Sequence, residues 1–134
     1  MASPDLDALV ASLELVAARV ADPAPLVYAW LFERFPGLQA LFVRDRSGIV
    51  RGQMVQVAIE GLLDLAGDRA YAAGLLQTER VNHQGLGVPP EAFDSFYGVL
   101  LEVFREICGT EWTAEMEASW SRLTAAAVTA AVDA

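Results

Sequence analysis

Apolar residues recur at spacings of three and four along most of the chain. In the first such run, residues 6–20, they follow a potential helix cap at Ser3 and a proline in the first turn, which predicts an amphipathic helix. Residues 22–25, Asp-Pro-Ala-Pro, interrupt this helix. A second helix over residues 26–35 should end before Pro36, because a residue that precedes proline avoids the helical region.

The remaining pattern predicts five more helices. A loop of charged and turn-forming residues at 44–48 and the glycines and prolines farther along the chain separate these segments. The expected helices cover residues 38–43, residues 49–66, residues 69–84, a long segment that begins within 88–91 and reaches 108, and a last segment from 113 to the C-terminus. No pattern indicates a strand. The sequence therefore predicts an all-α fold of six or seven helices, in a single domain over residues 1–134.

Composition and charge exclude several classes of structure and of binding partner. The chain has 134 residues, of which 54% are hydrophobic and 20% charged, so it can bury a substantial helical core. Its formal net charge of −9 argues against unaided binding to nucleic acid or to an anionic membrane. A single cysteine, Cys108, excludes an internal disulfide framework and a multi-cysteine metal site. No signal sequence or apolar run of about 20 residues is evident. We expect a cytoplasmic protein.

The chemistry of the chain centres on its only histidine, His83, which lies at the end of a predicted helix and is followed by Gly85 and Gly87. On position alone, His83 is typical of an ordinary histidine near the negative end of a helix dipole. Residues elsewhere in the chain change this interpretation.

Residues 28–36 read Tyr-Ala-Trp-Leu-Phe-Glu-Arg-Phe-Pro and are followed by Leu41-Phe42. This segment resembles the second and third helices of bacterial single-domain globins and flavohaemoglobins, in which a distal tyrosine precedes the proline and a phenylalanine that stacks on the haem follows it. Tyr28 and Phe42 match these two roles.

The resemblance continues to the end of the chain. His83 stands at the place of the proximal histidine of the family, Gly87-Val88 matches a common Gly-Val pair, and Trp120 matches a frequent tryptophan of the last helix. The signal covers about residues 26–123 and depends on spacing across four elements, since no single motif is diagnostic.

The resemblance implies a globin fold that encloses one noncovalent haem b (iron protoporphyrin IX), with His83 as the iron ligand. One ring nitrogen would bind iron, and the other would donate to a backbone carbonyl near Glu79 or to a nearby side chain. Apolar candidates for the walls of the haem slot are Phe42, Val57, Leu75, Leu76, Val88 and Phe93. Each of these residues would also suit an ordinary core.

The distal side leaves two alternatives open. Tyr28 either faces the gas ligand or is a buried core tyrosine, and the resemblance favours the first role. Counted from Phe42, its distal partner falls at Gln53 or at Met54, because the connecting loop can slip by one residue. The common tyrosine–glutamine pairing favours Gln53, although Gln53 also continues a polar helix face. If Met54 does not face the ligand, it is expected to fill a gap in the core. A role as a sixth iron ligand is possible but less favoured.

Two departures from the flavohaemoglobin pattern affect the proximal side. Phe93 stands where those proteins have a tyrosine, and no residue matches their proximal glutamate. A strongly basic proximal ligand is therefore unsupported. No reductase domain is evident either, so redox turnover would need an external reductase.

The remaining candidates have weaker support. Arg44, Arg46, Arg51 and Arg80 could pair with haem propionates, although solvated arginine is the simpler interpretation for each. Cys108 is expected to be inert core.

The resemblance favours reversible binding of oxygen, and of nitric oxide or carbon monoxide. The alternatives are a nitric oxide dioxygenase that uses a separate reductase, a haem sensor, and a small acidic helical interaction module without haem. Turnover with a generic reductase would identify the enzyme, and the absence of colour would identify the interaction module. The sequence leaves the oligomeric state open.

Overall fold

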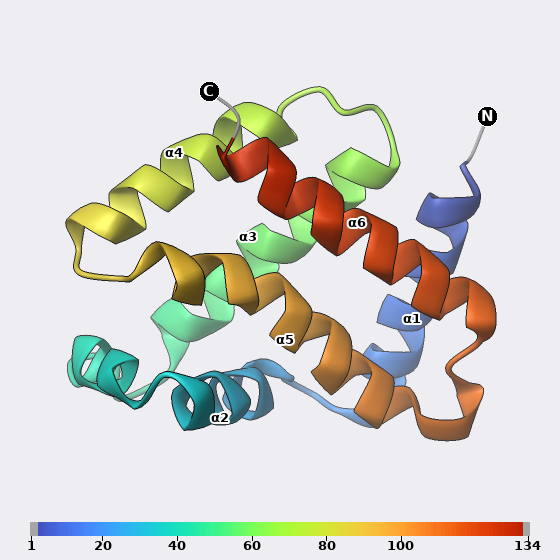
Figure 1. Ribbon diagram of the computed structural model, residues 1–134. Helices are drawn as coiled ribbons and strands as arrows, with labels where there is room; N and C mark the ends of the chain where they lie inside the picture. Colours follow the sequence, from blue (N-terminus) through green and yellow to red (C-terminus); the bar gives the residue numbers. More distant parts are fainter. Residues whose placement is uncertain (1–2, 133–134) are drawn as a thin grey trace.

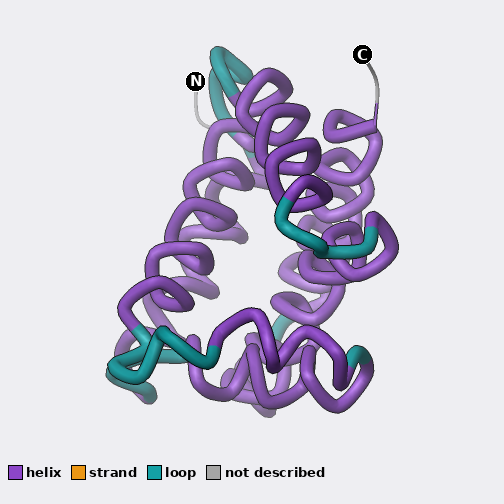
Figure 2. Tube along the Cα trace, turned by 90° about the vertical axis from the view of Figure 1, so that its left-hand side faces the viewer, coloured by secondary structure: helices purple, strands orange, loops and turns teal. Residues whose placement is uncertain are grey.

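We describe the protein from a computed structural model that covers residues 3–132. Six α-helices and two short 3₁₀ helices, joined by loops and turns, form the described residues, and none of these residues forms a strand (Figure 2). In chain order the elements are α1 (Pro4–Arg19), α2 (Ala24–Arg34), η1 (Pro36–Phe42), α3 (Ile49–Ala66), α4 (Ala72–Gly85), α5 (Pro90–Cys108), η2 (Gly109–Glu111) and α6 (Ala114–Val132). The predicted all-α architecture is confirmed.

Capping residues and prolines set most of the helix boundaries. The Ser3 hydroxyl accepts the Leu6 N–H at 3.0 Å, and the Thr113 hydroxyl accepts the Met116 N–H at 3.0 Å, so each side chain satisfies an N–H that the first turn leaves unpaired. The predicted helix at 38–43 is present as η1, a 3₁₀ helix that starts at Pro36.

The start of α4 differs from the prediction by three residues. The sequence pattern placed it at Arg69, but this residue has a φ of +55° and the helix begins at Ala72. The cause is Asp64 near the end of α3, whose carboxylate accepts the backbone N–H groups of Ala70, Tyr71 and Ala72 at 3.0, 3.0 and 2.7 Å. A side chain from the preceding helix therefore caps α4 and shapes the turn that leads into it.

The helices cross in layers rather than forming a parallel bundle (Figure 1). Helix α5 runs through the middle of the molecule and contacts α1, α2, α4 and α6, while α6 also packs on α1, α3 and α4. In Figure 1, α4 lies above the N-terminal half of α5, and α2 with η1 lies below it. Side chains of α2 and α4 line a common cavity, which is described below.

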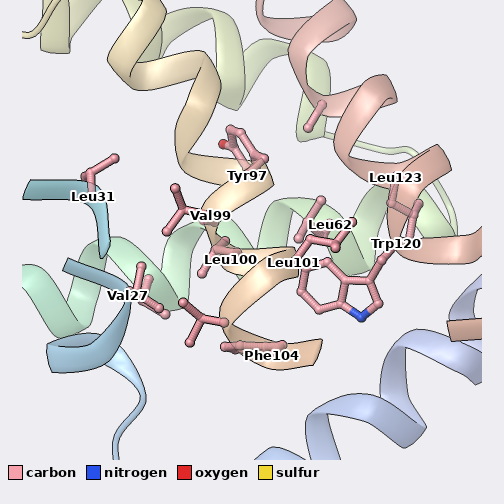
Figure 3. Close-up of a cluster of buried hydrophobic side chains, with 14 of the residues drawn as sticks. Val27, Leu31, Leu62, Tyr97, Val99, Leu100, Leu101, Phe104, Trp120 and Leu123 are labelled. Carbon is pink, nitrogen blue, oxygen red and sulfur yellow. The ribbon is translucent and has the colours of Figure 1, made fainter. Parts of the chain in front are cut away.

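The main core lies at the other end of α5. Phe104, Leu62, Leu100 and Leu123 are at most 2% exposed there, and they surround the fully buried indole of Trp120 (Figure 3). The Trp120 Nε1–H donates to the Ser12 hydroxyl at 2.8 Å, so this buried polar group is paired. Trp120 is thus part of the core that supports α5.

Within residues 3–132, no single helix has both the length and the apolar composition of a membrane span; α1 and α2 pass that test only as a pair, across a bend of 103°.

Candidate functional site

An apolar cavity of about 250 Å³ lies between α2, η1, α3, α4 and the N-terminal half of α5. All nine site residues predicted from the sequence line this cavity, although they come from six different segments of the chain. They are Tyr28, Phe42, Gln53, Met54, Val57, Leu76, His83, Val88 and Phe93. The structure therefore brings the predicted residues together around one space.

His83 enters the cavity from the last turns of α4. Its Nδ1 lies 2.6 Å from the carbonyl oxygen of Glu79, one helical turn earlier, which is the first of the two acceptors expected from the sequence. Because a carbonyl only accepts, Nδ1 must carry the proton, and a neutral ring then has its lone pair on Nε2. No hydrogen bond to Nε2 is found among the described residues. The imidazole thus has one nitrogen engaged and the other free to bind a metal.

Two neighbours restrict the His83 ring. The Phe93 ring lies 5.2 Å from it, centroid to centroid, and the imidazole side chain is only 19% exposed. The Glu79 carboxylate is also close, with Oε2 3.6 Å from Nδ1, which is too long for a hydrogen bond. The backbone carbonyl of Glu79 is therefore the acceptor, and its carboxylate acts on the ring only through space.

The turn after α4 directs Val88 toward the cavity. Gly87 has a φ of +95°, a conformation that favours glycine, and the Val88 N–H donates to the His83 carbonyl at 2.9 Å. The Gly-Val pair noted in the sequence therefore closes the end of the helix that carries His83.

Tyr28 lies on α2 and is 3% exposed. Its ring is surrounded by Phe32, Phe42 and Phe96, with centroids 5.6, 5.3 and 5.8 Å away. Burial raises the pKa of its phenol well above the ordinary value, so the hydroxyl remains a proton donor at physiological pH.

The hydroxyl of Tyr28 has one protein partner among the described residues, the thioether of Met54. The oxygen donates to Met54 Sδ at 3.3 Å, across the interface between α2 and α3. Gln53, the partner favoured by the sequence, also lines the cavity, but its side chain is exposed and makes no hydrogen bond in the described part of the chain. The hydrogen bond to Tyr28 is therefore made by Met54 and not by Gln53.

The sequence reading missed several residues of the cavity wall. Besides the predicted residues, Leu75 and Glu79 among them, the lining includes Leu31, Leu38, Val50, Ala58, Ala92, Phe96 and Tyr97. Helical spacing would have found most of them, since Leu31 follows Tyr28 by three positions, Ala58 follows Met54 by four and Tyr97 follows Phe93 by four.

Tyr97 is a buried residue of the missed set that carries a polar group. It is 4% exposed, and in Figure 3 its oxygen points away from Trp120. No hydrogen bond to this hydroxyl is found within residues 3–132. Burial raises the pKa of the phenol, and the nearby carboxylates of Glu79 and Asp94 raise it further. Tyr97 therefore stays protonated in the cavity wall.

The four arginines considered for anionic groups lie outside the cavity lining. Arg51 Nε pairs with Asp45 at 3.1 Å, Arg80 Nε pairs with Asp94 at 3.0 Å, and Arg44 and Arg46 are exposed. Arg51 and Arg80 thus already have carboxylate partners within the protein, which weakens the expectation that they pair with propionates.

Cys108 is fully buried, with Sγ 3.9 Å from the Ser12 carbonyl oxygen. Burial raises the pKa of its thiol, so the less reactive protonated form is favoured, as expected for core.

The donor set of the cavity fits a haem better than a bare metal ion. Among the described residues, no group of three or more His, Cys, Asp or Glu side chains is placed to hold a metal. A single imidazole with a free Nε2, facing an apolar cavity, is what an iron porphyrin requires from a protein, because the macrocycle supplies four of the iron ligands. His83 would bind the iron, and Phe42, Leu76, Val88 and Phe93 would contact the ring.

Comparison with known families shows a match over most of the chain. The model of the family described as Globin matches residues 26–131, which include every residue of the cavity lining. Comparison with curated proteins and with solved structures gives no significant match.

Proposed function

Because this chain belongs to the globin family, we propose that it binds one haem b noncovalently in the cavity between α3 and α4 and reversibly binds oxygen there. The family implies haem binding and a function related to oxygen. The residue roles, the haem type and the further ligands nitric oxide and carbon monoxide are our proposal.

The geometry of His83 is the observation that supports this proposal most directly. Its Nδ1–H is held by the Glu79 carbonyl at 2.6 Å, and the ring faces an apolar cavity. The hydrogen bond orients the ring, keeps it in one tautomer and increases its basicity as a ligand. His83 would therefore be the proximal ligand.

The opposite wall would discriminate among gas ligands. A haem bound here would supply a ferrous iron on which oxygen carries more negative charge than carbon monoxide does. Tyr28 offers a buried, protonated phenol at this wall, and an O–H donor favours the ligand that carries more charge. We therefore assign Tyr28 the role of stabilising oxygen relative to carbon monoxide.

The apolar walls serve a second purpose. The cavity is lined mainly by carbon, from Leu31, Leu76, Ala92 and Phe96 among others, and such walls keep water away from the reacting atoms. Slow access of water would favour reversible gas binding over oxidation of the iron.

A titration of the purified apoprotein with hemin tests the proposal. We expect saturation at one haem per chain and an intense Soret band. The ferrous form should give distinct, reversible spectra with oxygen and carbon monoxide. If hemin binds weakly, without saturation at one equivalent, the proposed function is wrong and a helical interaction module without haem is favoured.

A further inference from the structure

Tyr28 and Met54 form a hydrogen-bonded pair across two helices of the cavity wall. The phenol lies on α2 and the thioether on α3, with 3.3 Å between the oxygen and Sδ. Three aromatic rings surround the phenol, at centroid distances of 5.3 to 5.8 Å. Because the ring is held in place, the hydroxyl can change partner only by rotation of its O–H bond or by a small shift.

A phenol has a single proton to donate. While Met54 accepts this proton, it is not available to a gas ligand in the cavity. A ligand that needs the Tyr28 donor must therefore displace the thioether as acceptor, whereas a ligand that needs no donor gains little from that exchange. Sulfur is a weak acceptor, so the exchange can go to completion.

We infer that Met54 lowers the affinity of this site for oxygen, because it holds the Tyr28 hydroxyl until an incoming ligand accepts the proton. This inference rests on the proposed function and names the residue that regulates it. Met54 is a positioning residue in this role, since it acts through Tyr28.

The neighbouring residue does not fit the role. Gln53 is exposed and makes no hydrogen bond among the described residues, whereas Met54 is half-buried and contacts the phenol. Adjacent positions on a helix point about 100° apart, so the two side chains cannot both face Tyr28. Removal of the sulfur should therefore have an effect that removal of the Gln53 amide does not reproduce.

Substitution Met54→Leu tests the inference, because it removes the acceptor and nearly conserves volume. A net hydrogen bond of ordinary strength corresponds to a roughly 2- to 10-fold change in an equilibrium constant. We expect the dissociation constant for oxygen to fall by about this factor and that for carbon monoxide to change less. Met54→Ile, which also lacks sulfur, should give the same shift, and Gln56→Leu on the exposed face of α3 serves as a control for surface substitution.

The variant Tyr28→Phe separates the hydrogen bond from cavity shape. In a Tyr28→Phe background, Met54→Leu should leave the oxygen affinity unchanged, because there is no longer a proton to hold. An equal effect of Met54→Leu in both backgrounds would overturn the inference, and so would a shift that follows Gln53→Leu instead.

A measurement without haem keeps this test separate from that of the proposed function. Urea unfolding of the apoprotein for wild type, Tyr28→Phe, Met54→Leu and the double variant gives the coupling between the two residues. We expect the unfolding constants to deviate from independence by roughly 2- to 10-fold. Zero coupling would overturn the inference even if haem binds, whereas coupling without a Soret band would contradict only the proposed function.

Discussion

The two walls of the cavity are built in different ways. The wall that carries His83 depends on contacts close in sequence, since the imidazole is oriented by Glu79 four residues earlier and the helix is closed by Gly87 and Val88. The wall that carries Tyr28 depends on contacts between α2, η1, α3 and α5, which place Met54, Phe42 and Phe96 around one phenol. The contacts in the His83 wall can therefore be predicted from sequence spacing. The contacts in the Tyr28 wall depend on how the helices pack against one another.

Both walls nevertheless depend on an aspartate that caps a helix. Asp45 accepts the Val50 and Arg51 N–H groups at 3.1 and 3.0 Å at the start of α3, and Asp64 caps α4. Burial raises the pKa of Asp64, but backbone hydrogen bonds from Tyr71, Ala70 and Ala72 lower it more, so the net pKa lies below the ordinary value. The ionised aspartates are therefore part of what places the two walls.

The largest expected effect is on the local wall. His83→Ala should abolish tight haem binding, because the chain has no other imidazole to replace the ligand. The loss should exceed the roughly 10- to 100-fold cost of removing a residue that only orients a metal ligand. Hemin titration followed at the Soret band measures it, with Gln84→Ala as the adjacent control and circular dichroism as the check that helices persist. A wild-type Soret spectrum and haem affinity in His83→Ala would rule out the proximal assignment.

On the wall built by helix packing, Tyr28→Phe should speed oxygen dissociation by about 10- to 100-fold. A hydrogen bond to a charged group contributes roughly 1.5–3 kcal/mol, and each 1.4 kcal/mol is a factor of ten. Carbon monoxide dissociation should change much less, because carbon monoxide takes on less charge. Stopped-flow kinetics of both gases measure this difference. Equal oxygen off-rates in wild type and variant would mean that Tyr28 is only core.

Asp64→Asn tests how much the capping of α4 by Asp64 contributes to the stability of the His83 wall. We expect a loss of roughly 1–2 kcal/mol in the free energy of unfolding, as for other helix caps. Because the folded-state pKa of Asp64 is lowered, its ionic contribution is complete above the unfolded pKa and disappears as pH falls through the folded pKa. Urea unfolding at pH 7 and at pH 3 should therefore show that wild type and variant differ less in their free energy of unfolding at the lower pH. A difference that does not decrease on acidification would mean that the carboxylate charge contributes nothing.

The smallest effect concerns the bond between iron and His83. The acceptor for Nδ1–H is a backbone carbonyl, and the Glu79 carboxylate lies 3.6 Å away. Resonance Raman of the ferrous, gas-free protein should place the iron–histidine stretch in the range of oxygen carriers, and Glu79→Gln should shift it only slightly. A stretch in the peroxidase range that falls in Glu79→Gln would show that the carboxylate, not the carbonyl, accepts this proton.

The sequence by itself was sufficient to predict those features that depend on residues close together in the chain. Apolar periodicity, capping residues and prolines located the seven predicted helical segments, because helix formation depends on side chains three and four positions apart. The same reasoning anticipated the bond between His83 and the Glu79 carbonyl, since residues four apart meet on a helix. The spacing of Tyr28, Phe42 and His83 indicated a globin, and the family match confirms it.

Tertiary structure decided what depends on the contact of distant segments. The residue that hydrogen-bonds Tyr28, Met54 rather than Gln53, depends on the rotation of α3 about its axis, which its packing against α2 determines. The start of α4 moved to Ala72 because Asp64, in the preceding helix, caps it. Arg51 pairs with Asp45 and Arg80 pairs with Asp94. No periodic pattern in the sequence predicts these ion pairs. The physical reason is the same in each case: side-chain hydrogen bonds between separate elements depend on how the helices cross, and sequence spacing does not encode that geometry.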